Sequence, residues 1–328
     1  MKESWERTEQ PVSLELKQIK EIVEPVFSGK RVTYAEAMST GFRNSNYKIT
    51  VEGMADPFVL RLYREDGRIA YKELAIAGLI SPTVPVANFI HVDTSCTIFN
   101  QPWAVQEWKQ GIHLRDVLKT GTALDVASAA ASIGRVLNGI HNYTFPEFGF
   151  FGKDLRISEP FNTDAEGFLA FVEDSLFHKP CGSWLGDELT QAVWSFCQSN
   201  LAALKESRSH ARPVLVHSDF NGLNILMQRD AADCSVSAVL DWEFAFSWNR
   251  YVDIGNILRY EAADSVFEKH FIAAYQEHGT VLDKNWRLLS KLEDLIALCE
   301  LLNHSSRETP NRIRDLQQLI ANTVLPFR

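Results

Sequence analysis

The stretch that decides the fold is residues 213–246, PVLVHSDFNGLNILMQRDAADCSVSAVLDWEFAF. It reads as two short apolar strands that are each followed at once by polar residues: one leads into Asp219 and the other into Asp241. Asn224 lies between them and precedes a further apolar run. A strand that ends in a carboxylate places that carboxylate at the edge of a sheet. Two such strands can therefore direct two carboxylates, with an amide beside them, at one point.

Asp219, Asn224 and Asp241 are the residue types that metal-assisted phosphoryl transfer uses. One Asp lies near the attacking hydroxyl, while an Asn and a second Asp hold Mg²⁺ on the nucleotide phosphates. The spacing His-x-Asp-x-x-x-x-Asn fixes only three positions, so by itself an ordinary polar turn between core strands explains it equally well. The second strand-Asp unit, 22 residues after Asp219, favours the catalytic interpretation.

These residues also resemble a known family, the aminoglycoside phosphotransferase and choline kinase-like family, which is related to the protein kinases. The resemblance is carried by His217-Ser218-Asp219 with Asn224, and by Asp241-Trp242-Glu243. Ser218 replaces the usual Gly at a position that sets backbone shape. The resemblance implies an α+β, two-lobed protein kinase-like fold. An N-terminal antiparallel-sheet lobe (residues 1–108) would bind nucleotide, and a larger, mainly helical lobe (residues 109–328) would carry catalysis and acceptor binding.

The N-terminal region predicts a helix and then an antiparallel sheet. A helix is expected over residues 14–24 with Ser13 as its N-cap. Strands are expected over 31–35, 46–51 and 57–63, and, after a helix over 69–80, over 88–92, 96–99 and 103–108. Residues 39–46 form a polar turn with a single Gly, which in a kinase-like fold covers the phosphates. Ser45 and backbone N–H groups are its candidate donors.

The resemblance also implies the nucleotide contacts of this lobe. Arg61 stands where the family carries a phosphate-binding Lys, and a guanidinium can bind phosphate bidentately. Glu73 fits the Glu that pairs with that cation, although without the family it would be interpreted as part of a solvated helix face. Backbone groups of Glu107 and Trp108 are expected to hydrogen-bond the adenine base.

The second lobe predicts helices that support the catalytic stretch. They are expected from 112, and over 123–141, 163–177, 188–207, 265–278, 286–303 and 311–323. His141 is interpreted as a packed structural histidine, and His217 as a scaffold of the catalytic loop. Asp253 is expected to cap a helix and to hold that loop through His217 or a backbone N–H. Glu243 is either a substrate contact or an outer-shell metal partner.

Composition excludes several classes of partner. Hydrophobic residues make up 45% of the chain and charged residues 23%, as in globular proteins. The net charge of −9 argues against nucleic acid and anionic membranes and fits a cationic acceptor. No apolar run approaches ~20 residues, and the first residues lack a signal-peptide core. Five widely spaced cysteines show no zinc spacing and predict reduced thiols in a cytoplasmic protein.

Together these features predict a small-molecule kinase that transfers the γ-phosphate of ATP or GTP, with Mg²⁺, to a hydroxyl. The alternative is a nucleotide-binding pseudokinase or regulator. Arg61 and the Gly-poor loop favour that alternative, whereas the intact Asp219, Asn224 and Asp241 favour catalysis. A protein kinase is disfavoured because no Ala-Pro-Glu motif follows Asp241. The identity of the acceptor, the preferred nucleotide and the oligomeric state stay open.

Overall fold

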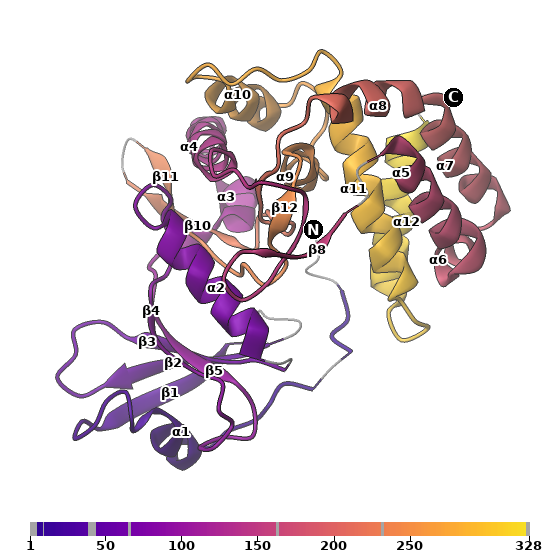
Figure 1. Ribbon diagram of the computed structural model, residues 1–328. Coiled ribbons are helices and arrows are strands. Elements are labelled where there is room, and N and C mark those ends of the chain that lie inside the picture. The colour runs from indigo at the N-terminus through magenta and orange to yellow at the C-terminus, as the bar shows by residue number, and fades with distance from the viewer. Residues whose placement is uncertain are drawn as a thin grey trace.

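The computed structural model describes residues 5–8, 10–38, 44–64, 67–161, 164–230 and 233–325. They form a smaller lobe around a five-stranded sheet and a larger, mainly helical lobe, which Figure 1 shows at the lower left and upper right. The two-lobed α+β architecture expected from the sequence is therefore confirmed. Within the described residues, no helix is long and apolar enough to cross a membrane.

The N-terminal lobe is an antiparallel sheet with strand order β1-β2-β3-β5-β4. Its strands are β1 (Val32–Met38), β2 (Ser45–Val51), β3 (Phe58–Leu62), β4 (Phe89–Asp93) and β5 (Trp103–Glu107). Alternate residues of β2 are buried in a core shared with helix α1 (Leu16–Val23). The N-cap of α1 is Glu15 rather than the predicted Ser13, because Glu15 and Gln18 form a capping box.

The strand expected over residues 96–99 does not form. β4 ends at Asp93, whose Oδ1 accepts a hydrogen bond from the Ser95 N–H at 2.7 Å, and Cys96 then has a φ of 55°. This Asx-type turn and the left-handed residue bend the backbone out of an extended path. The chain rejoins the sheet only at β5, which pairs with both β3 and β4.

Helix α2 (Gly67–Ile80) connects the two lobes. Its Ala70 packs with Tyr63 and Ala104 beside the sheet, whereas Ile76 and Ile80 join the core of the C-terminal lobe. In Figure 1 the helix accordingly lies between the sheet and the helical lobe. Because one rigid helix belongs to two cores, its position fixes how the lobes face each other.

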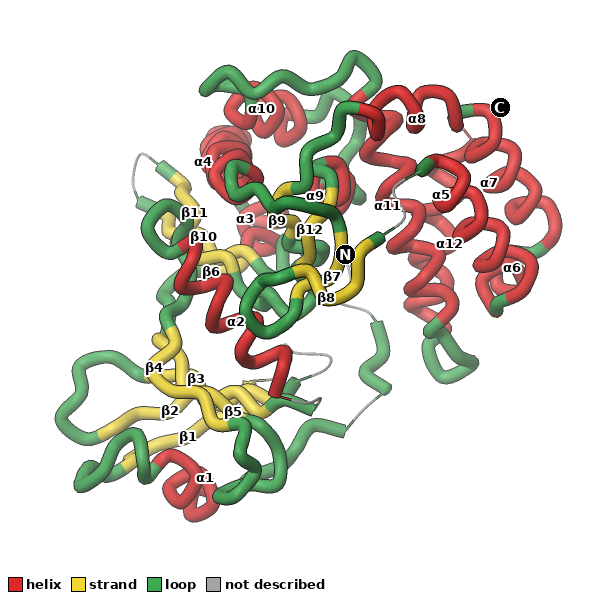
Figure 2. Tube along the Cα trace, viewed as in Figure 1, coloured by secondary structure: helices red, strands yellow, loops and turns green. Residues whose placement is uncertain are grey.

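The C-terminal lobe contains ten α-helices among the described residues and two small sheets, ordered β11-β10-β6 and β8-β7-β12-β9. The helices are α3 (Leu114–Thr120), α4 (Ala123–His141), α5 (Ala165–Glu173), α6 (Pro180–Leu185), α7 (Asp187–Ser199), α8 (Leu201–Ser209), α9 (Tyr251–Ile257), α10 (Val266–Tyr275), α11 (Trp286–Asn303) and α12 (Pro310–Val324). The strands are β6 (Ile112–His113), β7 (Gly149–Phe151), β8 (Ile157–Pro160), β9 (Val214–Val216), β10 (Ile225–Arg229), β11 (Cys234–Val239) and β12 (Phe246–Trp248). Figure 2 shows that α5, α6, α7, α11 and α12 gather on the side away from the N-terminal sheet.

Three helices of this lobe have bounds that differ from the predicted ones. Residues 112–113 pair as β6 with β10, so the helix expected from 112 begins at Leu114. The helix expected over 163–177 is α5, which continues as a π-helical turn over Asp174–His178. The helix expected over 188–207 is interrupted at Asn200, where φ is −106° and the side-chain amide donates to the Phe196 carbonyl at 2.8 Å. An Asn side chain that bonds backbone in this way competes with helix propagation.

Residues 5–8 and 10–14, which we call the N-terminal strap, run from one lobe to the other (Figure 1). Trp5 is buried in the core of the C-terminal lobe, and its Nε1 donates to Asp315 of α12 at 2.9 Å. The other end of the strap lies on β2, where the N–H of Leu14 donates to the Tyr47 hydroxyl at 2.8 Å and that hydroxyl donates to the Val12 carbonyl at 2.7 Å. Trp5 thus packs with the second lobe, although the sequence assigned it to the first.

We expect Trp5→Ala to lower the free energy of unfolding by about 2–4 kcal/mol, because it removes a large buried side chain that ties α12 to the strap. Thermal or urea unfolding measures the change. Trp5→Phe is the matched control: it keeps an aromatic ring but loses the hydrogen bond to Asp315, so it should cost only about 1 kcal/mol beyond its loss of volume. Equal stability of Trp5→Ala and the wild type would show that the strap does not hold the lobes.

Candidate active site

The pairing of β10 with β11 brings Asn224 and Asp241 together. Ile225 lies opposite Val239 in the ladder, so Asn224 comes just before one strand and Asp241 just after the other, at the same edge of the sheet. The N–H of Leu240 donates to the Asn224 carbonyl at 2.8 Å and closes this end. The antiparallel register, which the sequence did not reveal, therefore places the two candidate metal ligands side by side.

Both carboxylate oxygens of Asp219 accept hydrogen bonds from side-chain amides. Asn221 Nδ2 donates to Oδ1 and Asn224 Nδ2 donates to Oδ2, each at 2.9 Å. Asn221 is itself fixed, since its Oδ1 accepts the Leu223 N–H at 2.9 Å. Sequence reasoning missed Asn221; its only signal was an Asn two residues after the Asp, a position typical of an Asx-type turn.

Two residues of the site, one in the catalytic loop and one just after β11, have backbone conformations that favour glycine. Ser218 has a φ of 68° and Asp241 a φ of 65°, and both are non-glycine residues in the left-handed region. This explains why a family with Gly at the position of Ser218 uses it there. Asp253, which is completely buried, accepts the N–H groups of His217 and Ser218 at 2.8 Å each. These bonds hold the chain in a conformation that is costly for Ser218.

His217 links the catalytic loop to the segment that carries Asp241. Its imidazole is buried, its Nε2 donates to the Leu240 carbonyl at 2.8 Å and its Nδ1 accepts the Asp219 N–H at 3.2 Å. The ring also packs against Trp242, with centroids 4.5 Å apart. Both ring nitrogens are engaged by backbone groups, so the geometry suits a structural role.

Arg61, on β3, lies among three carboxylates. Its Nη2 is 2.5 Å from Asp241 Oδ1 and 3.6 Å from Glu243 Oε2, and its Nε is 3.4 Å from Glu73 Oε2. Burial by itself lowers the pKa of Arg61, but the charges of Asp241 and Glu73 outweigh it and raise the pKa well above the ordinary value. The guanidinium is therefore a permanent buried cation where β3 of the N-terminal lobe meets the segment after β11.

Glu73, on α2, is buried rather than part of a solvated helix face. Burial raises its pKa, and Arg61 opposes this effect. The hydroxyl of Tyr63 donates to Glu73 Oε2 at 2.7 Å. Glu73 is thus held between Tyr63 and Arg61, the arrangement that an ion-pair partner of a nucleotide-binding cation needs.

Two of the other predicted nucleotide contacts, Ser45 and the Glu107 N–H, already have hydrogen-bond partners within the protein. Ser45 is buried and its Oγ accepts the Val12 N–H at 2.9 Å, so its hydroxyl faces the N-terminal strap. Residues 39–43 of the predicted phosphate loop lie outside the described residues. The Glu107 N–H donates to the Asn88 carbonyl at 2.9 Å, so this donor is already used in the sheet. The ring of Trp108 lies under Lys48 Nζ, 4.3 Å from it.

A magnesium ion fits the donor set at the sheet edge. Among the described residues, no cluster of three or more His, Cys, Asp or Glu side chains could hold a metal alone. Mg²⁺ in nucleotide sites, however, needs only one or two protein oxygens and takes the others from phosphates and water. Asp241 is 33% exposed, and Asn224 turns its amide nitrogen towards Asp219, which leaves its amide oxygen for a cation.

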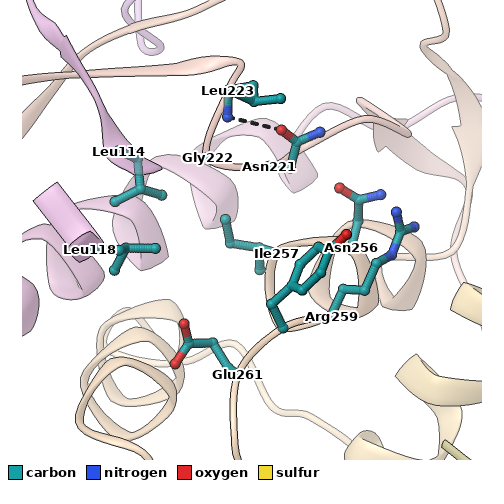
Figure 3. Close-up of a pocket in the computed structure, with 10 residues that line it drawn as sticks. Leu114, Leu118, Asn221, Gly222, Leu223, Asn256, Ile257, Arg259 and Glu261 are labelled. Carbon is teal, nitrogen blue, oxygen red and sulfur yellow. Dashed lines mark hydrogen bonds between the residues drawn. The ribbon is translucent and has the colours of Figure 1, made fainter. Parts of the chain in front are cut away.

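A pocket opens beside the catalytic loop, between α3 and the end of α9 (Figure 3). Leu114, Leu118 and Ile257 form its apolar wall. Asn256 and Glu261 are polar groups on its α9 side, and the buried Asn256 Oδ1 has no hydrogen-bond partner among the described residues. The pocket is small, about 30 Å³, and lies beside the Asn221 side chain that holds Asp219, so it has room for one small group of a bound molecule.

The buried His141 predicts that the free energy of unfolding depends on pH. It lies against Asp253, with Nε2 3.3 Å from Oδ2, and burial lowers its pKa below the ordinary value of 6.5. The unfolded chain therefore binds a proton that the folded chain does not, so stability is complete above pH 6.5 and falls as the pH drops below it. The slope from this group is up to about 1.4 kcal/mol per pH unit. Unfolding free energies measured from pH 5 to 8 should show this loss in the wild type and a smaller one in His141→Gln.

Two carboxylates that follow strands, an amide between them and a paired cation where two kinase-like lobes meet define a phosphotransferase. A sequence model described as "Phosphotransferase enzyme family" matches residues 35–290, so the chain belongs to that family. It is a small-molecule kinase with a hydroxyl group as acceptor. Among curated proteins, none matches the chain significantly in sequence.

Solved structures share the fold at low sequence identity. Aminoglycoside phosphotransferase APH(4)-Ia is 16% identical with a TM-score of 0.68, and the match covers 95% of this chain and 99% of that one. The GDP and kanamycin complex of APH(2")-IIia is 17% identical with a TM-score of 0.72 and the same coverage. A putative aminoglycoside phosphotransferase from Ralstonia eutropha is 15% identical, with a TM-score of 0.62 and coverage of 96% and 99%.

Proposed function

We propose that this enzyme transfers the γ-phosphoryl group of ATP or GTP to a hydroxyl of a small molecule that also carries an amino group. The observation that carries the proposal is the pair of amide hydrogen bonds that orients both oxygens of Asp219 beside Asn224. Complexes of similar structures, one with GDP and kanamycin and one with ADP and hygromycin B, support the nucleotide and the amino-bearing acceptor.

Asp219 orients the acceptor hydroxyl and accepts its proton. Because the transition state of phosphoryl transfer is loose, the base acts late and needs no strongly raised pKa. Asn224 and Asp241 would hold Mg²⁺, which neutralises phosphate charge when it is bound. Arg61, fixed by Glu73, offers its guanidinium to the nucleotide phosphates. Asp253 and His217 keep the loop in place for this chemistry.

The pocket beside Asn221 is the proposed entry for the acceptor (Figure 3). Its apolar wall suits a small apolar group of the acceptor, while Asn256 and Glu261 offer acceptors to hydroxyl and ammonium groups beside it. The net charge of −9 also favours a cationic acceptor. Four of the five free cysteines are buried, and free thiols fit the reducing cytoplasm in which we place the reaction.

A phosphate-transfer screen tests the proposal. The purified protein is incubated with Mg²⁺ and either ATP or GTP, and with aminoglycosides, amino alcohols and their deaminated analogues. Nucleoside diphosphate and phosphorylated product are then measured. We expect acceptor-dependent turnover that is lost in EDTA. Tight nucleotide binding without transfer to any acceptor would favour the pseudokinase or regulator that the sequence left open.

A further inference from the structure

Glu243 comes two residues after Asp241, yet the two carboxylates have different surroundings. The side chain of Asp241 is 33% exposed and that of Glu243 only 5%. Glu243 Oε2 accepts a hydrogen bond from Asn44 Nδ2 at 2.6 Å and lies 3.6 Å from Arg61 Nη2. A metal ligand must be accessible to an ion and its water shell. Asp241 meets this requirement, whereas the Glu243 carboxylate is enclosed by protein donors.

Side chains from three elements of the N-terminal lobe converge on Glu243. Asn44 immediately precedes β2, and Arg61 belongs to β3. Lys72, on α2, donates to the backbone carbonyls of Glu243 at 2.6 Å and Ala245 at 3.3 Å. Glu243 itself follows β11 of the C-terminal lobe. It is therefore the point at which three separate parts of the first lobe hold the metal-binding segment of the second.

The guanidinium of Arg61 explains why a second carboxylate is needed. A Lys presents a compact point charge, whereas an Arg presents a planar set of donors whose orientation matters. Glu73 Oε2 lies 3.4 Å from the Nε side of that plane, and Asp241 and Glu243 both face Nη2. If Asp241 held a metal ion, one of these partners would be engaged elsewhere. Glu73 and Glu243 would then remain to hold the plane.

We propose that Glu243 is a positioning residue: it orients the Arg61 guanidinium towards the nucleotide phosphates and anchors the base of the β1–β2 connection through Asn44, and it does not bind the metal. The inference rests on the proposed function. The sequence left two roles open for Glu243, substrate contact and outer-shell metal partner. The positioning role replaces both.

Nucleotide binding measured with and without metal tests this role. Titration calorimetry gives the Kd of ATP and of GTP for the wild type and for Glu243→Gln, once with Mg²⁺ and once in EDTA. We expect Kd to rise about tenfold in both conditions, because Arg61 acts on the phosphates whether or not the metal is present. A rise confined to Mg²⁺ would identify Glu243 as a metal partner, and no rise in either condition would also overturn the proposal.

A double-mutant cycle with Arg61→Lys separates positioning from a general effect of charge. A Lys has no plane to orient, so Glu243→Gln should change Kd less than twofold in that background. An undiminished effect would contradict the proposal. Glu293→Gln is the matched control: its carboxylate is equally buried, but it is bound by Arg208, Trp248 and Asn249 within the C-terminal lobe. It should lower stability and leave nucleotide affinity unchanged.

The failure of this inference differs from the failure of the proposed function. If the wild type binds nucleotide and Glu243→Gln binds it equally well, only the role of Glu243 is wrong. If the wild type binds neither ATP nor GTP in either condition, the kinase assignment fails and the role of Glu243 fails with it. Asn44→Ala gives a further check, because it removes the 2.6 Å bond to Glu243 without touching any charge, and it should reproduce part of the rise in Kd.

Discussion

Replacing Asp219 by Ala should lower kcat by about 10²–10⁴-fold, the range that removal of a positioned general base produces. Asn221 and Asn224 donate to its two oxygens, so the carboxylate has a fixed orientation. Nucleotide affinity should change little, because the groups proposed to bind phosphate and metal are Arg61, Asn224 and Asp241. Single-turnover kinetics with the acceptor found in the screen, together with calorimetric nucleotide titration, measures both quantities.

Asp219→Asn is the matched variant for this experiment. It keeps the shape of the side chain but cannot accept a proton, so its kcat should be nearly as low as that of Asp219→Ala. Circular dichroism and thermal unfolding check that both variants are folded. Activity within threefold of the wild type in Asp219→Asn would mean that Asp219 orients the hydroxyl without removing its proton, and full activity of Asp219→Ala would falsify the assignment altogether.

The second large effect is expected at Asp253. Asp253→Ala should lower the free energy of unfolding by about 3–5 kcal/mol, since it leaves the buried N–H groups of His217 and Ser218 without an acceptor. His141 loses its partner in the same substitution. Because the loop then loses the bonds that hold Ser218 at positive φ, catalysis should fall together with stability. Urea unfolding and steady-state kinetics at a temperature where the variant is folded measure the two losses.

Asp253→Asn separates the hydrogen bonds from the charge. Its amide oxygen still accepts one N–H, so the loss should be intermediate, about 1–3 kcal/mol. Asp56→Ala, at an exposed position, should change stability by less than about 0.5 kcal/mol and serves as the surface control. If Asp253→Ala cost no more than Asp56→Ala, the catalytic loop would have to be held by other groups.

Much of the fold followed from local pattern. Helix α4 has the predicted bounds because apolar residues recur at helical spacing and Thr122 caps its start. β3, which carries Arg61, and its neighbour β2 followed from the alternation of apolar residues and from the turn residues between them. The strand expected over 96–99 failed because the side chain of Asp93 made a turn there. The helix expected over 188–207 was interrupted because the side chain of Asn200 donated to the Phe196 carbonyl. In both cases a single polar side chain outweighed propensity.

The sequence by itself determined which residues are the candidates for the reaction centre. His217, Asp219, Asn224 and Asp241 lie within 25 residues of chain, and the pairing of β10 with β11 brings Asn224 and Asp241 to the same edge of one sheet. Only the tertiary structure decided what those residues meet. The bond from Asn44 to Glu243 joins residues 199 apart, and the bond from Trp5 to Asp315 joins residues 310 apart. Such partners depend on how whole elements pack against each other, and no local spacing encodes that.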